Sequence, residues 1–199
     1  PGWGIRASPG MGLAYATADR GGCHQRAWPT AYEVKRAKGP DGMLVERYSP
    51  EGKALVTRAD QDGNATLFSL VACDFATGAI GWNRYLGMLN AATGMKMTPS
   101  DFSVLGERIW NQIRAFNVRE GFSRKDDTLP QRIFDEPLAS GLAKGKQLAR
   151  PEFERMLDDY YLLRGWDLKT GYPTKETLVR LGLEDAARSL DDLELLPPK

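Results

Sequence analysis

Histidine and cysteine are scarce in this chain of 199 residues, which contains one histidine and two cysteines. The cysteines, Cys23 and Cys73, are far apart in the sequence, and neither belongs to a CxxC pair. Two thiols are too few for a disulfide framework, and one thiolate does not hold an iron–sulfur cluster by itself. The residues alone therefore give little support for a metal centre made by this chain.

An excess of charge and a long apolar run are also missing. The net charge is +1, from 27 basic and 26 acidic residues, so nothing suggests nucleic acid or an anionic membrane as a partner. No apolar run approaches the ~20 residues of a membrane-spanning helix. We find no signal peptide and expect a cytoplasmic protein. The start at Pro1, without an initiator Met, leads us to expect the C-terminal part of something longer.

Strand patterns are nearly absent, whereas several segments place apolar residues at helical spacing. We predict an all-α fold, an irregular helical domain with long ordered loops. The predicted helices cover residues 9–18, 53–60, 64–73, 100–118, a stretch that starts at 151, and 174–182.

Capping residues and apolar faces support these helices. We expect Asn64, Ser100 or Asp101, and Thr174 to act as N-caps, and Pro151 to lie in a first turn. The predicted apolar faces are Phe102, Leu105, Ile109, Ile113 and Phe116 in one helix, and Phe153, Met156, Leu157, Tyr160 and Leu163 in another.

The segment from Arg20 to Arg26 concentrates reactive side chains. It contains the single histidine, His24, together with Cys23 and two arginines. Planar guanidinium groups bind phosphate oxygens two at a time, and an imidazole moves a proton near neutral pH. A structural histidine and solvated or carboxylate-paired arginines explain the same residues, so composition leaves both interpretations open.

Three further stretches have an ordinary explanation. Cys73 lies in an apolar stretch, where a cysteine is commonly a small buried hydrophobe, although a thiolate also suits iron. The mixed charges of residues 117–130 are typical of a solvated or salt-bridged segment. Residues 164–174 combine turn formers with aromatics and indicate a packed loop.

Five blocks of the sequence, taken in order, resemble the aldehyde:ferredoxin oxidoreductase family. They are Ala14–His24, Cys73–Phe75, Asn117–Pro130, Tyr160–Asp167 and Thr170–Thr174. The resemblance covers nearly the whole chain but matches only the C-terminal third of a family member. It implies one C-terminal helical domain over 1–199, with 1–97 facing the cofactor and 98–199 as helical scaffold.

The family oxidises aldehydes to carboxylic acids and passes electrons to ferredoxin. The resemblance implies a tungsten (or molybdenum) bis-pterin and a 4Fe–4S cluster, both completed by N-terminal and middle domains that this chain does not contain. Carried over by position, Cys73 is the fourth cluster ligand and His24 the catalytic histidine beside the metal. The positions matched to pterin contacts are Arg20, Arg26, Ala72 and Asp74.

One departure from the family pattern concerns Phe68 and Val71. The family usually has an aspartate and a glycine at these positions, where the aspartate holds the pterin amino group; a phenyl ring accepts no such hydrogen bond. A related aromatic acyl-CoA reductase fits the sequence as well. A paralogue that binds pterin without turnover, and a non-catalytic structural or interaction fragment, are the remaining alternatives.

Overall fold

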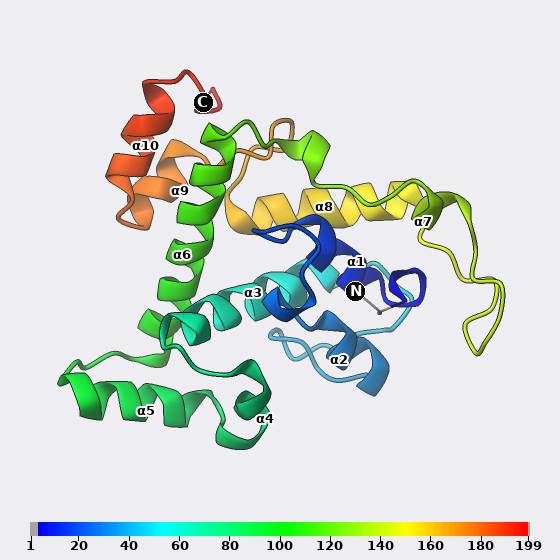
Figure 1. The fold of residues 1–199 in the computed structure, drawn as a ribbon, viewed down its shortest axis with the longest axis horizontal. Coiled ribbons are helices and arrows are strands. Elements are labelled where there is room, and N and C mark those ends of the chain that lie inside the picture. Colours follow the sequence, from blue (N-terminus) through cyan, green and yellow to red (C-terminus); the bar gives the residue numbers. More distant parts are fainter. Residues whose placement is uncertain (1–3, 199) are drawn as a thin grey trace.

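The fold is helical throughout the part of the chain that the computed structural model describes, residues 4–198 (Figure 1). In that range the only β-pairing is in isolated bridges, for example between Trp166 and Pro173. The all-α prediction with long ordered loops is therefore confirmed. Pro1, on which the expectation of a longer protein depends, lies outside the described residues.

The elements follow one another with loops of very different length. The α-helices are α1 (Pro9–Ala16), α2 (Pro29–Lys35), α3 (Lys53–Ser69), α4 (Thr77–Ile80), α5 (Trp82–Thr93), α6 (Pro99–Arg119), α7 (Arg132–Asp135), α8 (Arg150–Arg164), α9 (Lys175–Arg180) and α10 (Glu184–Asp191). Short 3-10 turns are η1 (Ile5–Ala7), η2 (His24–Arg26), η3 (Asp74–Ala76) and η4 (Arg124–Asp126).

The centre of the molecule is made by α3, α6 and α8, with α1 packed on α3 and α8. Figure 1 shows α6 running across one end of α3 and of α8, while α4 and α5 extend below and α9 and α10 lie above. Gly106 of α6 allows the close crossing, because a Cβ atom there would lie 2.0 Å from the carbonyl oxygen of Asp62. The largest apolar cluster joins α1, α3, α6 and α8 and includes Met11, Leu13, Trp110, Phe153, Tyr160 and Trp166.

The stretch 53–69 forms one continuous helix, so the prediction of separate helices at 53–60 and 64–73 was wrong. Gly63 does not interrupt α3, because the indole of Trp82 packs where a side chain would be. Asn64 is not an N-cap; its Nδ2 atom donates to the carbonyl of Gln25 at 3.0 Å. The helix ends where Val71 takes a left-handed conformation with φ of 55°.

The extent of α6 agrees with the prediction, but its cap and its face do not. Thr98 caps the helix in a reciprocal pair with Asp101. Phe116, predicted to be apolar core, is 53% exposed, whereas Trp110 and Arg114 are buried. The buried face of α6 is therefore rotated about the helix axis relative to the predicted face. The reason is that polar and charged side chains of this helix find partners in the interior.

Pro151 in the first turn of α8 and Thr174 as the N-cap of α9 are both confirmed. Leu163 is exposed, contrary to its predicted place on the buried face of α8. Arg164 is fully buried instead, because an ion pair with Asp62 and hydrogen bonds compensate its charge.

The proposed division of the chain at residue 97, into a cofactor-facing half and a scaffold half, stays a prediction.

Between residues 4 and 198, no single helix is long and apolar enough to span a membrane. The segments 53–69 and 74–80 are long and apolar enough for a membrane span only when they are counted together, and a bend of 112° separates them.

Candidate functional site

The segment between α1 and α2 is held in place by side chains of α3 and α6. The amide of Gln61 in α3 donates to the hydroxyl of Thr17 at 3.1 Å. Asn117 near the end of α6 donates to the carbonyl of Asp19 at 3.0 Å. Because both anchors come from the central helices, the backbone that leads into the Arg20–Arg26 segment is fixed by the core.

Arg26 is paired within this segment. Its Nε atom donates to Asp19 Oδ1 at 2.8 Å, and Nη2 donates to the second carboxylate oxygen. The side chains of Arg26 and Asp19 are only 13% and 4% exposed. The guanidinium also lies 5.3 Å from the ring centre of Phe68. The arginine is therefore held rigidly, and its planar face is covered by the residue that departs from the family pattern.

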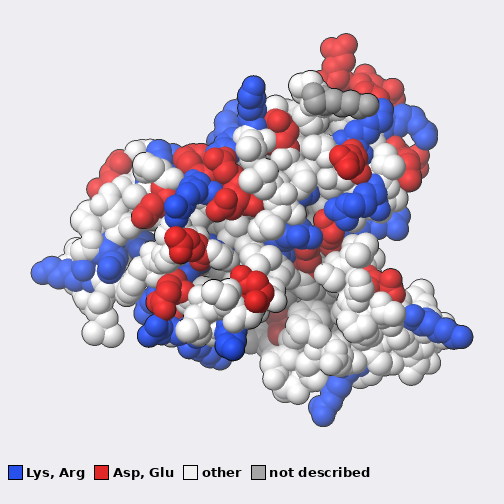
Figure 2. Space-filling view, turned by 180° about the vertical axis from the view of Figure 1, so that it is seen from behind, with Lys and Arg blue, Asp and Glu red and all other residues white. Residues whose placement is uncertain are grey.

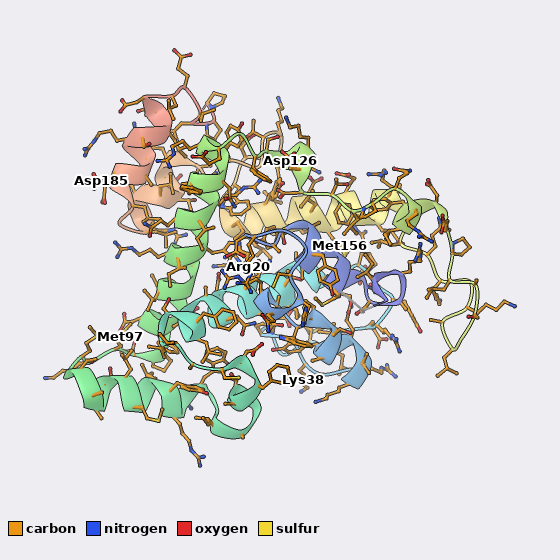
Figure 3. The ribbon with its side chains drawn as sticks, viewed as in Figure 1. Arg20, Lys38, Met97, Asp126, Met156 and Asp185 are labelled. Carbon is orange, nitrogen blue, oxygen red and sulfur yellow. The ribbon has the colours of Figure 1, made fainter. Side chains whose placement is uncertain are left out.

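Arg20 is exposed and makes fewer contacts. Its Nη2 atom lies 3.2 Å from the sulfur of Cys23 and 3.4 Å from the side-chain oxygen of Gln25. Hydrogen bonding to the Cys23 sulfur raises the pKa of Arg20 above its usual value. Figure 3 places Arg20 near the centre of the view, where the chain after α1 passes α3. This guanidinium is available to an anion.

Aromatic contacts connect His24 with the segment around Cys73. The imidazole meets Trp28 edge to face, with ring centres 5.4 Å apart, and Trp28 meets Phe75 in the same manner at 6.2 Å. Phe75 follows Cys73 by two residues. The structure therefore brings the two sequence-predicted segments next to each other through a chain of three rings.

Cys73 is an exposed free thiol whose sulfur lies 4.0 Å from a carboxylate oxygen of Asp74. Ala72 turns the other way and packs against the apolar cluster of α3, α5 and α6. Asp74 accepts the amide of Phe75 with Oδ1, while its buried Oδ2 has no hydrogen-bond partner among residues 4–198. The side chains of Ala72, Cys73 and Asp74 therefore lie in different environments.

Asp60 was missed by the sequence analysis. Its carboxylate accepts the backbone amide of Trp28 at 2.9 Å and a hydrogen bond from Tyr32. Burial raises the pKa of Asp60 to about 6. It lies in the wall of a cavity of about 400 Å³ that also borders Asp74 and Thr77. The sequence offers only an aspartate within a predicted helix as a signal, and such residues are too common to be specific.

Two buried ionic networks fix the scaffold around the site. Arg164 pairs with Asp62 and donates to Gln61 and Tyr160 at 2.9 and 3.0 Å. Arg114 binds both carboxylate oxygens of Asp127 and stacks over an indole. The blocks 117–130 and 164–174 are thereby salt-bridged and packed, which confirms the structural interpretation given to them.

A complete metal site is not formed by the described part of the chain. Among residues 4–198, no group of three or more His, Cys, Asp or Glu side chains is arranged to hold a metal ion. Cys73 and His24 are therefore single donors, each of which would need partners outside this chain.

Comparison with protein families gives a match over residues 1–183 to the family described as aldehyde ferredoxin oxidoreductase, domains 2 and 3. The tungsten-containing aldehyde ferredoxin oxidoreductase of Pyrococcus horikoshii is 38% identical over 186 residues, which is 93% of this chain and 30% of that protein. The Thermococcus kodakarensis protein of the same name is 37% identical with the same coverage. The chain thus spans about a third of the length of these relatives.

Two more distant proteins are also similar. The aliphatic sulfonate oxidoreductase WOR-like subunit of Pyrococcus furiosus is 30% identical over 184 residues, covering 89% of this chain and 25% of that protein. Among solved structures, the active-site complex of benzoyl coenzyme A reductase with 1,5-dienoyl-CoA matches with a TM-score of 0.61 and 23% identity. That match covers 75% of this chain and 22% of that one, and it concerns the fold alone.

Proposed function

Since this chain belongs to the aldehyde ferredoxin oxidoreductase family, we propose that it works as the C-terminal part of a tungsten- or molybdenum-pterin enzyme that oxidises aldehydes. The overall reaction converts an aldehyde, water and two oxidised ferredoxins into a carboxylate, two reduced ferredoxins and three protons. The match over residues 1–183 carries this proposal. We place the enzyme in the cytoplasm, together with the oxidised ferredoxin that would accept its electrons.

Cys73 fits the role of one ligand to a 4Fe–4S cluster. Its thiol is exposed and unoxidised, and a thiolate is the donor that such clusters prefer. Around it, Val71 and Phe75 are 95% and 75% exposed, which is unusual for apolar side chains and suggests a surface covered by another part of the protein. The other cluster ligands would come from the remaining domains.

The charge distribution agrees with such a covered face. Figure 2 shows a lobe at the lower right that is almost free of charged residues; it corresponds to α4 and α5 at the lower left of Figure 1. Within Trp82–Thr93 the only charged residue is Arg84. Exposed Trp82 and Met88 add apolar area to this lobe, which we assign to contact with the N-terminal and middle domains.

The pterin contacts fit less uniformly. Arg20 is exposed and offers its guanidinium to a phosphate or a polar ring edge. Arg26 is already bound to Asp19, so it would present at most one remaining nitrogen. Phe68 fills the usual aspartate position and accepts no hydrogen bond. We propose that Ala72 and Asp74 contribute through backbone groups, and that pterin recognition at Phe68 differs from the family pattern.

His24 is the residue we assign to proton transfer. Neither imidazole nitrogen is hydrogen-bonded within residues 4–198, while Trp28 fixes the orientation of the ring. A free ring nitrogen next to the reacting carbonyl would, as N–H, donate a hydrogen bond to its oxygen or, as a base, accept a proton from the water that adds to the carbonyl carbon. The metal–pterin group would supply the two-electron redox chemistry; the chain supplies the proton acceptor.

The test uses the full-length protein, purified without oxygen, with aldehyde oxidation followed by reduction of a viologen dye. His24→Ala should keep its tungsten and iron and lose at least 100-fold in kcat, as expected for removal of a general acid–base group. Cys73→Ser should lose iron, whereas the matched control Cys23→Ser should retain it. Unchanged turnover in His24→Ala, or unchanged iron in Cys73→Ser, would contradict the assigned roles.

A second candidate is reduction of an aromatic acyl-CoA thioester, favoured by the fold similarity to the benzoyl coenzyme A reductase complex. Turnover of benzoyl-CoA with a strong reductant, by an enzyme that does not oxidise aldehydes, would favour this function over the first proposal.

A third candidate is that the chain by itself is a non-catalytic fragment. We expect the isolated 199 residues to bind no tungsten, molybdenum or iron.

A further inference from the structure

One side of α3 holds the turn that carries His24. Asn64 Nδ2 donates to the carbonyl of Gln25, inside η2, at 3.0 Å, and Asp60 Oδ2 accepts the amide of Trp28, just beyond η2, at 2.9 Å. Residues four apart are neighbours on a helix surface, so both contacts come from one part of α3. The backbone that follows the histidine is therefore tied to a central helix at two points.

Trp28 is the residue through which the second of these contacts reaches the histidine. It lies between η2 and α2, and its amide is bonded to the Asp60 side chain. Its indole meets the imidazole of His24 edge to face, with ring centres 5.4 Å apart and ring planes at 86°. Because neither imidazole nitrogen is hydrogen-bonded within residues 4–198, the orientation of the imidazole depends on its packing against this indole.

The carboxylate of Asp60 is itself held by a second donor, the hydroxyl of Tyr32 in α2. Burial and the charge of Asp60 raise the pKa of Tyr32 to about 12, so this hydroxyl keeps its proton at neutral pH and remains a donor. Two donors on one carboxylate leave it little freedom to turn. The amide of Trp28 is thus bonded to an acceptor whose position is fixed.

No charged group takes Asp60 away from these two donors. Lys35 and Asp74 line the same cavity of about 400 Å³, but among residues 4–198 neither forms an ion pair or hydrogen bond with Asp60. The two groups that Asp60 binds, a backbone amide and a phenol, are both neutral. This pairing suits a residue that fixes the place of a backbone segment rather than one that neutralises a charge.

The position of Trp28 also sets the spacing between the two halves of the candidate site. Phe75, two residues after Cys73, meets the other ring of the pair, the indole, with ring centres 6.2 Å apart. A displaced Trp28 would therefore lose its contact with His24 and with the Cys73 segment together.

We propose that Asp60 is a positioning residue for His24: its carboxylate holds the backbone of Trp28, and the indole of Trp28 holds the imidazole at the angle that proton transfer requires. The inference rests on the proposed function and deepens it, because it adds the residue that orients the proton acceptor. In this role Asp60 acts through Trp28 and not on the substrate.

The experiment measures aldehyde oxidation by the full-length holoenzyme. Asp60→Leu has a similar volume but no acceptor; it should lower kcat at least tenfold, change the KM for the aldehyde less than threefold, and keep iron and tungsten. Asp60→Asn keeps an oxygen that accepts the Trp28 amide, so its kcat should be within threefold of the parent enzyme. The matched control is Asp159→Leu, at an exposed position of α8, which should leave kcat and KM unchanged.

A second variant tests the same connection from its other end. Trp28→Leu removes the indole but keeps the amide that Asp60 binds, and it should also lower kcat at least tenfold. This variant decides the matter if Asp60→Leu does not fold. Unchanged kcat in Trp28→Leu would overturn the inference.

A double-mutant cycle separates positioning of His24 from a general structural role. In the His24→Ala background, Asp60→Leu should lower the remaining kcat less than twofold, because the ring that Asp60 positions is already absent. A further tenfold loss in that background would show that Asp60 acts on something other than His24 and would overturn the inference.

Modification of His24 by diethyl pyrocarbonate, followed by mass spectrometry of the full-length protein, gives a readout that needs no turnover. An imidazole released from Trp28 should react at least threefold faster in Asp60→Leu, and at the parent rate in Asp60→Asn and Asp159→Leu. Equal extents of modification in all four proteins, complete lack of reaction included, would overturn the positioning role.

The outcomes also separate this inference from the function on which it rests. Aldehyde oxidation with unchanged kcat in Asp60→Leu would overturn the positioning role and leave the function intact. If the parent protein oxidises no aldehyde, the proposed function fails, and the modification rates still decide whether Asp60 controls the His24 ring.

Discussion

Arg26 and Asp19 form a two-pronged ion pair, with Nε and Nη2 of the guanidinium donating to the two carboxylate oxygens. Both side chains are largely buried, so solvent screens the pair only weakly. Its consequence is that the backbone from 19 to 26 closes into a compact loop, with His24 on it.

Asp19→Asn should destabilise the chain by about 3 kcal/mol, because a buried guanidinium would lose its counter-charge. Urea denaturation of the 199-residue chain measures the change. Asp192→Asn, at an exposed position, is the control and should change the free energy of unfolding by less than about 0.5 kcal/mol. A loss for Asp19→Asn no larger than that of the control would contradict the importance of the pair.

Phe68→Asp should change how Arg26 is bound. A carboxylate at position 68 would face the guanidinium that now lies 5.3 Å from the Phe68 ring and would compete with Asp19 for it. In this background Asp19→Asn should cost only about 1 kcal/mol. A double-mutant cycle in urea tests this; strictly additive free energies would indicate that position 68 does not reach Arg26.

Gly106→Ala should be strongly destabilising, by about 3 kcal/mol or more, because its Cβ would overlap the backbone of α3 at Asp62. Gly87→Ala in α5 is the matched control, since nothing lies within 4 Å of a Cβ there. Alanine should stabilise that helix by about 0.5–1 kcal/mol. Thermal unfolding of both variants gives the comparison, and similar midpoints would show that the crossing adapts.

Asp60 should make stability depend on pH. Its pKa in the folded state is about 6, above the ordinary value of 3.8, so the folded chain holds the proton more tightly than the unfolded one. The resulting stabilisation is complete below about pH 4 and is lost as the pH rises through 6, by about 3 kcal/mol in total. Denaturation at several pH values should show this fall, and Asp60→Asn should remove it. A parallel pH profile in the variant would assign the titration to another group.

The sequence was sufficient for the fold class and for the positions of α6, α8 and α9, because helical spacing and first-turn residues are local properties, although the cap and the buried face of α6 were predicted wrongly. It failed where long-range partners decide. Arg164 is buried and Leu163 is exposed because Asp62, far away in the chain, supplies a counter-charge. Gly63 is harmless to α3 because Trp82 fills the adjacent space.

The candidate site was predictable in part, for a related reason. His24, Arg20 and Cys73 stand out through their chemistry in a sequence with few such residues. The pairing of Arg26 with Asp19 was not predicted, since either a solvated arginine or another carboxylate fits the same composition. Asp60 owes its raised pKa to burial, which spacing along the chain does not reveal.

The continuity of α3 has one more consequence. Gln61, which anchors Thr17, and Phe68, which covers Arg26, are seven residues apart on a single helix, so a rise of about 1.5 Å per residue separates them by about 10 Å. A one-residue insertion between them would rotate everything after it by about 100°. The first anchor would survive, while the aromatic cover would swing away from the guanidinium and take the thiol-bearing turn with it.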